Sequence, residues 1–394
     1  MKRILINTLK KYHWIYTSYY YFFSYIIKLF GFFIRSNKNV FFIVCTGGKV
    51  YGDNIRPVYE ALLEDIRFKD WNFVWAFRDP ENFKLPDSTR TTKCKIDTPQ
   101  FLYNALKAKC WLTNVSVQRG LNFKNKGTYY INTWHGVPLK HIGLDIKEGT
   151  SFKVLGGVEK FDLICTMGTY DAQIAESAFG LDLCDIKVTG YPRNDIMFTE
   201  DMRIVRDRVK TYLDIDFSKK IVLYAPTFRD YNKDNFGSFY FELTLSADKF
   251  RKVLGDDYIL IVRAHGAIES SGVEGYIDAT SYPDVEDLLR ISDYLITDYS
   301  GIMFDYSLLE KPVICFAYDL SKYSENRGLY VNYKDFIPFP ICVDEDELYR
   351  TIKELDYKQG CEIAREFVKK CGLIGSNASK NVVNAIYDGL KCNA

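Results

Sequence analysis

The chain has 394 residues, of which 47% are hydrophobic and 26% are charged, and its formal net charge is +1. This length and composition are typical of an ordered globular protein with two or three domains, and they exclude a disordered chain. The near-neutral charge argues against a nucleic-acid partner, since a general nucleic-acid binder needs a basic surplus to contact phosphates.

The first 38 residues differ from the rest in composition. They carry seven Lys or Arg residues and no acidic residue, and twelve aromatic residues lie between Tyr12 and Phe33. Tyr and Trp prefer the headgroup level of a bilayer, and basic residues beside them are attracted to anionic lipid. We therefore expect residues 1–38 to form a helical segment that lies on the anionic cytoplasmic face of the cell membrane, as a peripheral attachment.

Two other interpretations of this segment stay open. Lys11 and Lys28 bracket only sixteen residues, whereas a spanning helix needs about 20 predominantly apolar ones. No small-residue cleavage site of a secretory signal follows the aromatic run. A true span is therefore disfavoured, and the remaining alternative is a helix packed on the protein body or on a second subunit.

Ten cysteines are scattered along the chain without any C-x-x-C pair. Several lie in apolar, strand-like runs, where a thiol behaves as a small buried hydrophobe, and this usage suits a reducing cytosol. The cysteines show no metal-ligand spacing, and we expect no bound metal and no cofactor.

From Val40 onward, short β-branched or aromatic runs alternate with helical patterns, which predicts an α/β fold with parallel sheets. Expected strands cover 40–46, 72–76, 111–114, 129–133, 163–166 and 186–189, and then 221–225, 258–262, 276–279, 294–297 and 313–316. Expected helices include 55–68, 99–108, 201–213 and three in the tail, the last over 377–390.

Two similar halves follow one another, with a polar boundary near residues 195–218. We expect Rossmann-like domains over 39–200 and 215–375, followed by a C-terminal helix over 376–394. Open parallel sheets bind ligands outside the carboxyl ends of their strands, so ligands are expected between the halves and motifs at strand exits matter most.

Two of the four histidines share one placement. His135 follows the expected strand 129–133, His265 follows the strand 258–262, and each is followed by glycine. Imidazole titrates near neutral pH and can donate to phosphate, so one histidine from each half is a plausible acid–base and phosphate-binding pair. The alternative is a pair of ordinary turn histidines bonded to nearby backbone.

The stretch from Asp293 to Asp305 predicts a strand, a polar turn and a helix. Ser300 can cap that helix, and the free N–H groups after it form an anion site. Asp298 and Asp305 would repel a phosphate there unless they face a hydroxyl or a cation, and either could bind a hydroxyl of a ribose or a polyol. Ordinary helix capping is the alternative.

Arginines follow three further turns. Arg229 ends the strand-exit motif YAPTFR and offers a planar fork to phosphate, or pairs with Asp230 on the surface. Arg193 lies in GYPRND and Arg327 precedes Gly328 in a loop. The sequence contains none of the motifs of P-loop NTPases, classical dehydrogenases or serine hydrolases, so these three enzyme classes are excluded.

Taken together, the blocks WHGVPLKHIG, GYPRND, YAPTFRD, VRAHG and DVEDLLRISDYLITDYSGIMFDYSLLEKPVICFAYDL, with RGLY behind them, resemble the CDP-glycerol glycerophosphotransferase family. The resemblance covers about residues 40–390. It implies a GT-B fold of two Rossmann-like domains and an enzyme of teichoic acid or capsule polymer synthesis. It further implies a CDP-glycerol donor, an undecaprenyl-diphosphate-linked saccharide or polymer as acceptor, and release of CMP.

The resemblance also implies roles for single residues. His135 corresponds to the candidate base, His265 to a second essential histidine near the pyrophosphate, and Ser300 with Gly301 to a phosphate-binding turn. Donor-binding roles are carried over to a further set: Arg229, Arg263, Asp298, Asp305 and Arg327.

The sequence departs from the family pattern at Val137, Gly266 and Gly301, where Thr, Pro and Ser are usual. Gly301 removes a possible phosphate donor but leaves the helix N–H groups in place. These departures affect the prediction of the exact donor more than the prediction of the reaction class.

Three alternatives to this activity are a CDP-ribitol ribitolphosphotransferase, a GT-B glycosyltransferase that uses a nucleotide sugar, and an idle membrane-bound scaffold. The acceptor, the number of units added, the choice of wall teichoic acid or capsule, and the oligomeric state are left open by the sequence.

Overall fold

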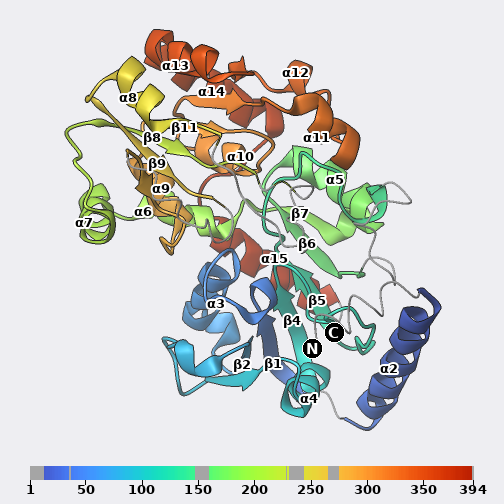
Figure 1. The fold of residues 1–394 in the computed structure, drawn as a ribbon. Helices are drawn as coiled ribbons and strands as arrows, with labels where there is room; N and C mark the ends of the chain where they lie inside the picture. The colour runs from blue at the N-terminus through green and yellow to red at the C-terminus, as the bar shows by residue number, and fades with distance from the viewer. Residues whose placement is uncertain are drawn as a thin grey trace. The chain divides into compact units, whose positions relative to one another are not determined.

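The computed structural model describes residues 13–34, 37–146, 159–227, 229, 244–264 and 275–392. The chain divides into two compact units. Unit 1 comprises Met1–His135, Ile142–Asp195 and Ile374–Ala394, and unit 2 comprises Gly136–His141 and Ile196–Leu373 (Figure 1).

A parallel sheet forms the centre of unit 1. Within the described residues it has seven strands in the order β3-β2-β1-β4-β5-β6-β7. The strands are β1 (Asn37–Val44), β2 (Asn72–Phe77), β3 (Thr91–Lys95), β4 (Ala108–Thr113), β5 (Tyr129–Asn132), β6 (Leu163–Thr166) and β7 (Ile186–Val188). The central strands are near-continuous apolar runs because helices cover both faces of the sheet.

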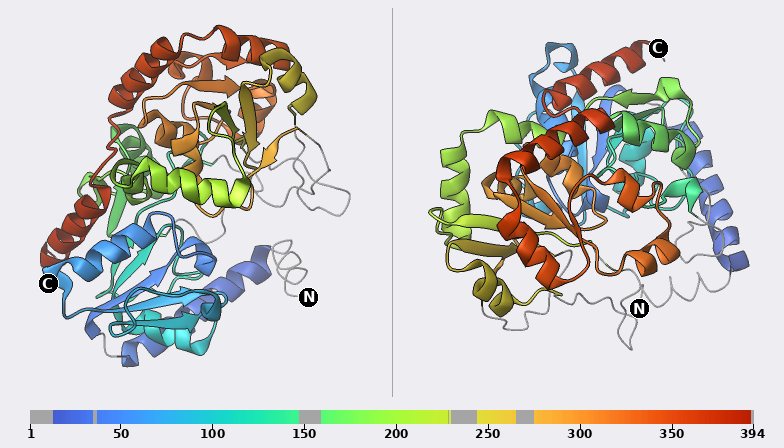
Figure 2. Two further views of the ribbon diagram at one scale, coloured as in Figure 1. Left: turned by 90° about the vertical axis from the view of Figure 1, so that its left-hand side faces the viewer. Right: turned by 90° about the horizontal axis from the view of Figure 1, so that it is seen from above.

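Helices cover this sheet on both sides. They are α3 (Ile55–Glu64), α4 (Pro99–Lys107), α5 (Thr169–Phe179) and α15 (Ala378–Cys392), and α2 (His13–Phe33) packs on α4. α3 and α15 pack on the face that carries Phe41 and Ile43, whereas Phe42 meets Phe101 of α4 on the other face. The last helix of the chain therefore belongs to the core of the first unit, as its red ribbon among blue elements shows (Figure 2).

Helix α2 has one packed face and one exposed aromatic face. Ser24, Ile27 and Gly31 follow helical spacing and are buried, and the Ser24 hydroxyl accepts from the Asn122 N–H at 2.9 Å. Away from them lie exposed aromatic side chains: Trp14 (71% exposed), Tyr21 (67%), Tyr25 (69%) and Phe32 (84%). No helix among the described residues has both the length and the hydropathy needed to cross a bilayer.

Unit 2 repeats the design with a smaller parallel sheet. Its six described strands are ordered β10-β9-β8-β11-β12-β13. They are β8 (Lys220–Tyr224), β9 (Tyr258–Val262), β10 (Ile277–Asp278), β11 (Tyr294–Thr297), β12 (Val313–Phe316) and β13 (Ile341–Cys342). Their buried side chains pack with those of α8 and α13 in one apolar cluster.

The described helices of unit 2 flank this sheet (Figure 1). They are α6 (Ile196–Thr199), α7 (Met202–Leu213), α8 (Ala247–Leu254), α9 (Val285–Ile291), α10 (Ile302–Ser307), α11 (Leu320–Arg327), α12 (Tyr333–Phe336), α13 (Glu345–Glu354) and α14 (Tyr357–Cys371). α10 and α14 pack on each other through Phe304 and Phe367.

Three local expectations differ from the structure. β3 and β13 were not expected, because TTKCK alternates exposed polar residues and β13 has only two residues. The helix expected over 55–68 ends at Glu64, since Asp65 is extended and its carboxylate accepts from the Arg67 N–H to start a short 3-10 turn over Ile66–Phe68. None of the ten cysteines forms a disulfide, and seven of them are buried.

Residues Gly136–His141 leave unit 1 immediately after His135 and form part of unit 2, and we call them the strap. Val137 and Leu139 are buried. The Tyr330 N–H donates to the Leu139 carbonyl at 2.9 Å, and the His141 N–H donates to the Gly328 carbonyl at 3.2 Å. The strap thus docks on the loop after α11 like an added strand.

Candidate active site

In both units the strand order reverses direction beside the first strand. The reversal lies between β1 and β4 in unit 1 and between β8 and β11 in unit 2. In open parallel sheets, ligands bind at this switch point, outside the carboxyl ends of the strands. We therefore expect the functional side chains of each unit to lie at its own switch point.

At the switch point of unit 1, Asn114 joins the ends of β1 and β4. Its side-chain oxygen accepts from the Thr46 N–H at 2.7 Å, and its amide nitrogen donates to the Thr46 hydroxyl at 3.1 Å and to Asp53 at 2.8 Å. Because the Asn114 side chain is buried and bonded on both sides, the peptide that carries it is held in one orientation.

His135 uses that peptide as its ring partner. Its Nδ1 lies 2.9 Å from the Asn114 carbonyl oxygen. A carbonyl can only accept, so Nδ1 carries the proton and Nε2 holds the lone pair of the neutral ring. A base that removes a proton from a hydroxyl needs this tautomer.

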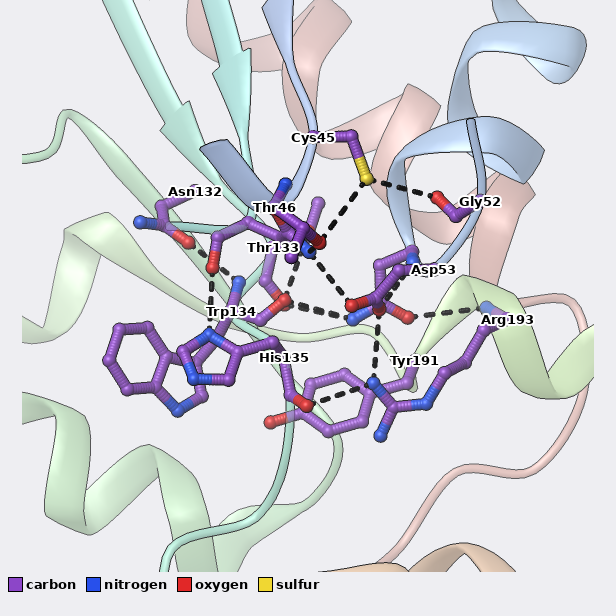
Figure 3. A network of polar contacts seen from close by, with 12 residues as sticks. Cys45, Thr46, Gly52, Asp53, Asn132, Thr133, Trp134, His135, Tyr191 and Arg193 are labelled. Atoms are coloured by element: carbon purple, nitrogen blue, oxygen red, sulfur yellow. Dashed lines mark hydrogen bonds and ion pairs between the residues drawn. The ribbon is translucent and has the colours of Figure 1, made fainter. Parts of the chain in front are cut away.

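The turn that carries His135 is held by its carbonyl oxygens. Asn54, which is fully buried, donates to the carbonyls of Thr133 at 3.3 Å and Trp134 at 3.1 Å. Arg193 donates from one terminal nitrogen to the His135 carbonyl at 3.0 Å and to Asp53 at 3.1 Å (Figure 3). Three consecutive carbonyls thus have side-chain donors.

Strained backbone accompanies this network. Thr46 (φ 46°), Asp53 (φ 50°) and Trp134 (φ 53°) all adopt the left-handed conformation, which non-glycine residues rarely do. Such conformations persist only where their surroundings determine them, and they cluster at functional sites.

Sequence reasoning missed Asn54, Asn114 and Asp53, and it gave Arg193 little weight. Each is a polar residue just after a strand or a glycine turn. Polar residues are common at such turns for structural reasons alone, so their presence there does not indicate a site. Only the sheet order brings them to His135.

At the switch point of unit 2, Asp298 joins the ends of β8 and β11. It is 1% exposed and accepts from the N–H groups of Thr227 at 2.8 Å and Tyr299 at 2.6 Å. Its other oxygen pairs with Arg229 at 2.8 Å. The Asp298 carboxylate is thereby surrounded by residues of the loops after β8 and β11.

Asp230, the surface partner considered above for Arg229, lies outside the described residues. Arg229 itself is 5% exposed and pairs with two carboxylates. Besides Asp298, it pairs with Asp319 through Nε and the second terminal nitrogen, at 2.8 and 3.0 Å. Three tyrosine rings surround the guanidinium: Tyr299, Tyr318 and Tyr323, with centroids 5.0 to 5.4 Å away. Burial raises the pKa of Tyr299, so its hydroxyl stays protonated and donates to Asp319 at 3.0 Å.

Ser300 and Gly301 precede the six-residue helix α10. Gly301, not Ser300, takes the capping position, and the Ser300 hydroxyl accepts from the Ile302 N–H at 3.3 Å. A Cβ atom at position 301 would lie 2.7 Å from the Val137 carbonyl oxygen. The strap therefore explains the glycine, since a serine side chain would collide with its backbone.

The other donor-site candidates lie around these loops. Arg263 follows β9 and donates to the carbonyls of Ala279 at 3.3 Å and Tyr282 at 2.6 Å, and burial lowers its pKa. Asp305 is buried in α10, and Arg327 is the last residue of α11. His265 and Gly266 lie outside the described residues. No group of three or more potential metal ligands occurs in the part of the chain that the structure describes.

Comparisons with known proteins agree on one family. Residues 24–388 match the family described as CDP-Glycerol:Poly(glycerophosphate) glycerophosphotransferase. A teichoic acid glycerol-phosphate transferase of Staphylococcus aureus is 33% identical over 97% of this chain and 99% of its own length. A teichoic acid poly(glycerol phosphate) polymerase of Staphylococcus epidermidis is 34% identical over 88% of this chain, which spans about half the length of that relative.

Solved structures extend the likeness to the fold. The wall teichoic acid polymerase TagF, as a histidine-to-asparagine variant soaked with CDPG, superposes with a TM-score of 0.78, at 31% identity and 90% coverage of both chains. A UDP-GlcNAc 2-epimerase from Neisseria meningitidis shares the fold alone, with a TM-score of 0.53 at 13% identity over 89% of this chain. The family match, the full-length transferase relative and the shared α/β fold identify the chain as a member of the CDP-glycerol:poly(glycerophosphate) glycerophosphotransferase family.

Proposed function

We propose that the protein transfers glycerol phosphate from CDP-glycerol to a hydroxyl of a lipid-linked acceptor in teichoic acid or capsule polymer synthesis, with release of CMP. The observation that carries this proposal is the family match over residues 24–388, together with a transferase relative matched over nearly its whole length. The acceptor that we propose is an undecaprenyl-diphosphate-linked saccharide or polymer.

In the proposed reaction, the acceptor oxygen attacks the β-phosphorus of CDP-glycerol while Nε2 of His135 takes its proton. A P–O bond forms to the acceptor, the bond between the β-phosphorus and the bridging oxygen breaks, and CMP leaves with that electron pair. The hydrogen bond from Nδ1 of His135 to Asn114 supports this role, because it leaves Nε2 as the basic atom. If the transition state is loose, most of the catalysis comes from positioning and charge stabilisation.

The donor side is assigned to unit 2, in a GT-B arrangement of two Rossmann-like domains. Its support is that both sheets share the strand order 3-2-1-4-5-6 of dinucleotide-binding folds. His265, Arg263, Arg327 and the Ser300–Gly301 turn would face the pyrophosphate. Asp305 keeps its proposed place near the donor hydroxyls.

For Arg229 and Asp298 we propose positioning roles in place of direct contact with the donor. Their charged atoms bond to each other, to Asp319 and to backbone within the described residues. They would hold the loop after β8 against the loop after β11, which carries Ser300.

A ribitol donor is the second candidate, because a teichoic acid poly(ribitol-phosphate) polymerase of Bacillus spizizenii is 36% identical over 186 residues, or 45% of this chain.

The deciding experiment incubates the protein with CDP-glycerol or CDP-ribitol beside a lipid-linked primer analogue and scores CMP release and product mass. Release of CMP from CDP-glycerol with a product heavier by whole glycerol phosphate units supports the proposal. Turnover of CDP-ribitol alone, or a glycosidic product from a nucleotide sugar, contradicts it.

We also propose that α2 attaches the protein to the anionic cytoplasmic face of the membrane as a peripheral anchor. Its support is the face that carries Trp14, Tyr21, Tyr25 and Phe32, with the exposed Lys28 beside them. The opposite face is already packed on unit 1, so deleting the helix would uncover apolar surface and confuse the result.

Substitution of single exposed positions is the cleaner test of the anchor. Trp14→Ser with Phe32→Ser should reduce co-sedimentation with anionic vesicles several-fold while leaving turnover of a soluble acceptor unchanged. Ile66→Ser, at a 75% exposed position outside α2, is the matched control. Undiminished binding of the double variant contradicts the anchor.

A further inference from the structure

Arg193 and Asp53 form an ion pair beside the backbone of His135. Their side chains are only 12% and 22% exposed, and the contacting atoms are 3.1 Å apart. Arg193 uses the same terminal nitrogen for Asp53 and for the His135 carbonyl. The position of one backbone carbonyl therefore depends on where this ion pair lies.

The ion pair is connected to the ring of His135 from a second side. Asp53 accepts from the Asn114 amide at 2.8 Å, and the Asn114 carbonyl receives the Nδ1 proton of His135. Asn54 completes the ring of contacts, because its oxygen accepts from the Arg193 N–H at 3.2 Å while its amide donates to the two carbonyls before His135.

We propose that Arg193, with Asp53, is a positioning residue that sets the tautomer and direction of the His135 imidazole for proton removal. This inference rests on the proposed function, since it takes His135 as the base. Arg193 acts through the His135 carbonyl, and Asp53 acts through Asn114, so the backbone and the ring of His135 are fixed by one pair.

The chemistry explains why a paired arginine suits this place. A guanidinium has several rigid donors and can bond to a carboxylate and a carbonyl together, which a lysine ammonium matches poorly. Asp53 balances its charge, so the imidazolium that forms when His135 takes a proton does not meet an uncompensated cation. Loss of the pair frees the turn, whose Trp134 is held at a φ of 53°.

The test measures turnover and the tautomer of the His135 imidazole. Arg193→Gln should lower kcat by about 10- to 100-fold, since a misplacement of the base by about 1 Å can cost 10² in rate. The KM for CDP-glycerol should change less than about threefold, and Arg193→Lys should recover only part of the loss. In a His135→Ala background, Arg193→Gln should have almost no additional effect, because residues that act as a unit are non-additive.

Arg90→Gln is the matched control. Arg90 also pairs with a carboxylate, Asp87, and donates to the backbone carbonyls of Leu63, Phe68 and Lys69, but it does so near the start of β2. Its loss should affect stability without lowering kcat.

A spectroscopic readout separates this inference from the proposed function. With only four histidines in the chain, long-range proton–nitrogen spectra of protein labelled with nitrogen-15 histidine should show His135 as the Nδ1–H tautomer. Arg193→Gln should produce a mixture of tautomers. An unchanged tautomer, an unchanged kcat, or additive losses with His135→Ala would each overturn the positioning role. Full turnover by His135→Ala alone would instead refute the proposed base.

Discussion

Replacing Arg229 by Met decides whether that arginine holds unit 2 together or binds the donor. The substitution keeps an unbranched, flexible side chain but removes the guanidinium and its charge. It removes the guanidinium that pairs with Asp298, which is 1% exposed, and with Asp319, which is 12% exposed. We therefore expect a large loss of stability.

The size of the loss follows from the contacts. Removing one partner of a buried ion pair typically costs about 3–5 kcal/mol. Asp298 keeps two backbone N–H donors, and Asp319 keeps the Tyr299 hydroxyl, so the lower end of that range applies. Loss of the contacts with three tyrosine rings adds about 0.5 kcal/mol or more. Adding Asp298→Asn to Arg229→Met should recover part of the loss.

The assay is urea unfolding followed by two probes. All five tryptophans precede Gly136 and belong to unit 1, so their fluorescence reports unit 1, whereas circular dichroism reports both units. Arg229→Met should lower the midpoint seen by circular dichroism more than the one seen by fluorescence. Arg365→Met, whose pair with Glu310 is about half exposed, is the control and should cost less than about 1 kcal/mol.

One result would refute this reasoning. If Arg229→Met changes the free energy of unfolding by less than about 1 kcal/mol and raises the KM for CDP-glycerol, the guanidinium serves the donor directly. The contact between the Arg229 guanidinium and a phosphate, which the sequence predicts, would then be correct.

Three further predictions concern other parts of the molecule. Gly301→Ser should reduce turnover at least about tenfold, measured as CMP release, because the new side chain displaces the Val137 carbonyl; an unchanged rate would contradict this. Burial raises the pKa of Asp171 to about 6. Between about pH 4 and 6 the folded state therefore binds a proton at this carboxyl that the unfolded state has lost. The free energy of unfolding should thus fall by about 1.4 kcal/mol per pH unit as the pH rises through this range. Asp171→Asn should remove that slope in urea titrations, and an identical slope would refute it. Gly389→Ala should lower the tryptophan-detected midpoint, since a Cβ there would collide with the Tyr129 hydroxyl; an unchanged midpoint would contradict this close packing of α15 on Tyr129.

The periodicity of the sequence predicted most elements correctly. The strands expected over 163–166, 258–262, 294–297 and 313–316 have the observed bounds, because a strand buried on both faces is a continuous apolar run. β13 was missed because a two-residue strand has no period, and β3 because its residues face solvent on one side. The break after Glu64 depends on an Asp65 contact with the next turn, which no hydrophobic pattern carries.

The sequence by itself determined the α/β class and the family blocks, since each depends on residues close together in the chain, and it predicted His135 as the candidate base. The tertiary structure decided which distant residues meet. Asn114 reaches His135, and Asp298 reaches Thr227, only because both sheets reverse their strand order beside the first strand. The return of α15 to unit 1 and the docking of the strap on unit 2 likewise depend on long-range packing, to which local propensity contributes nothing.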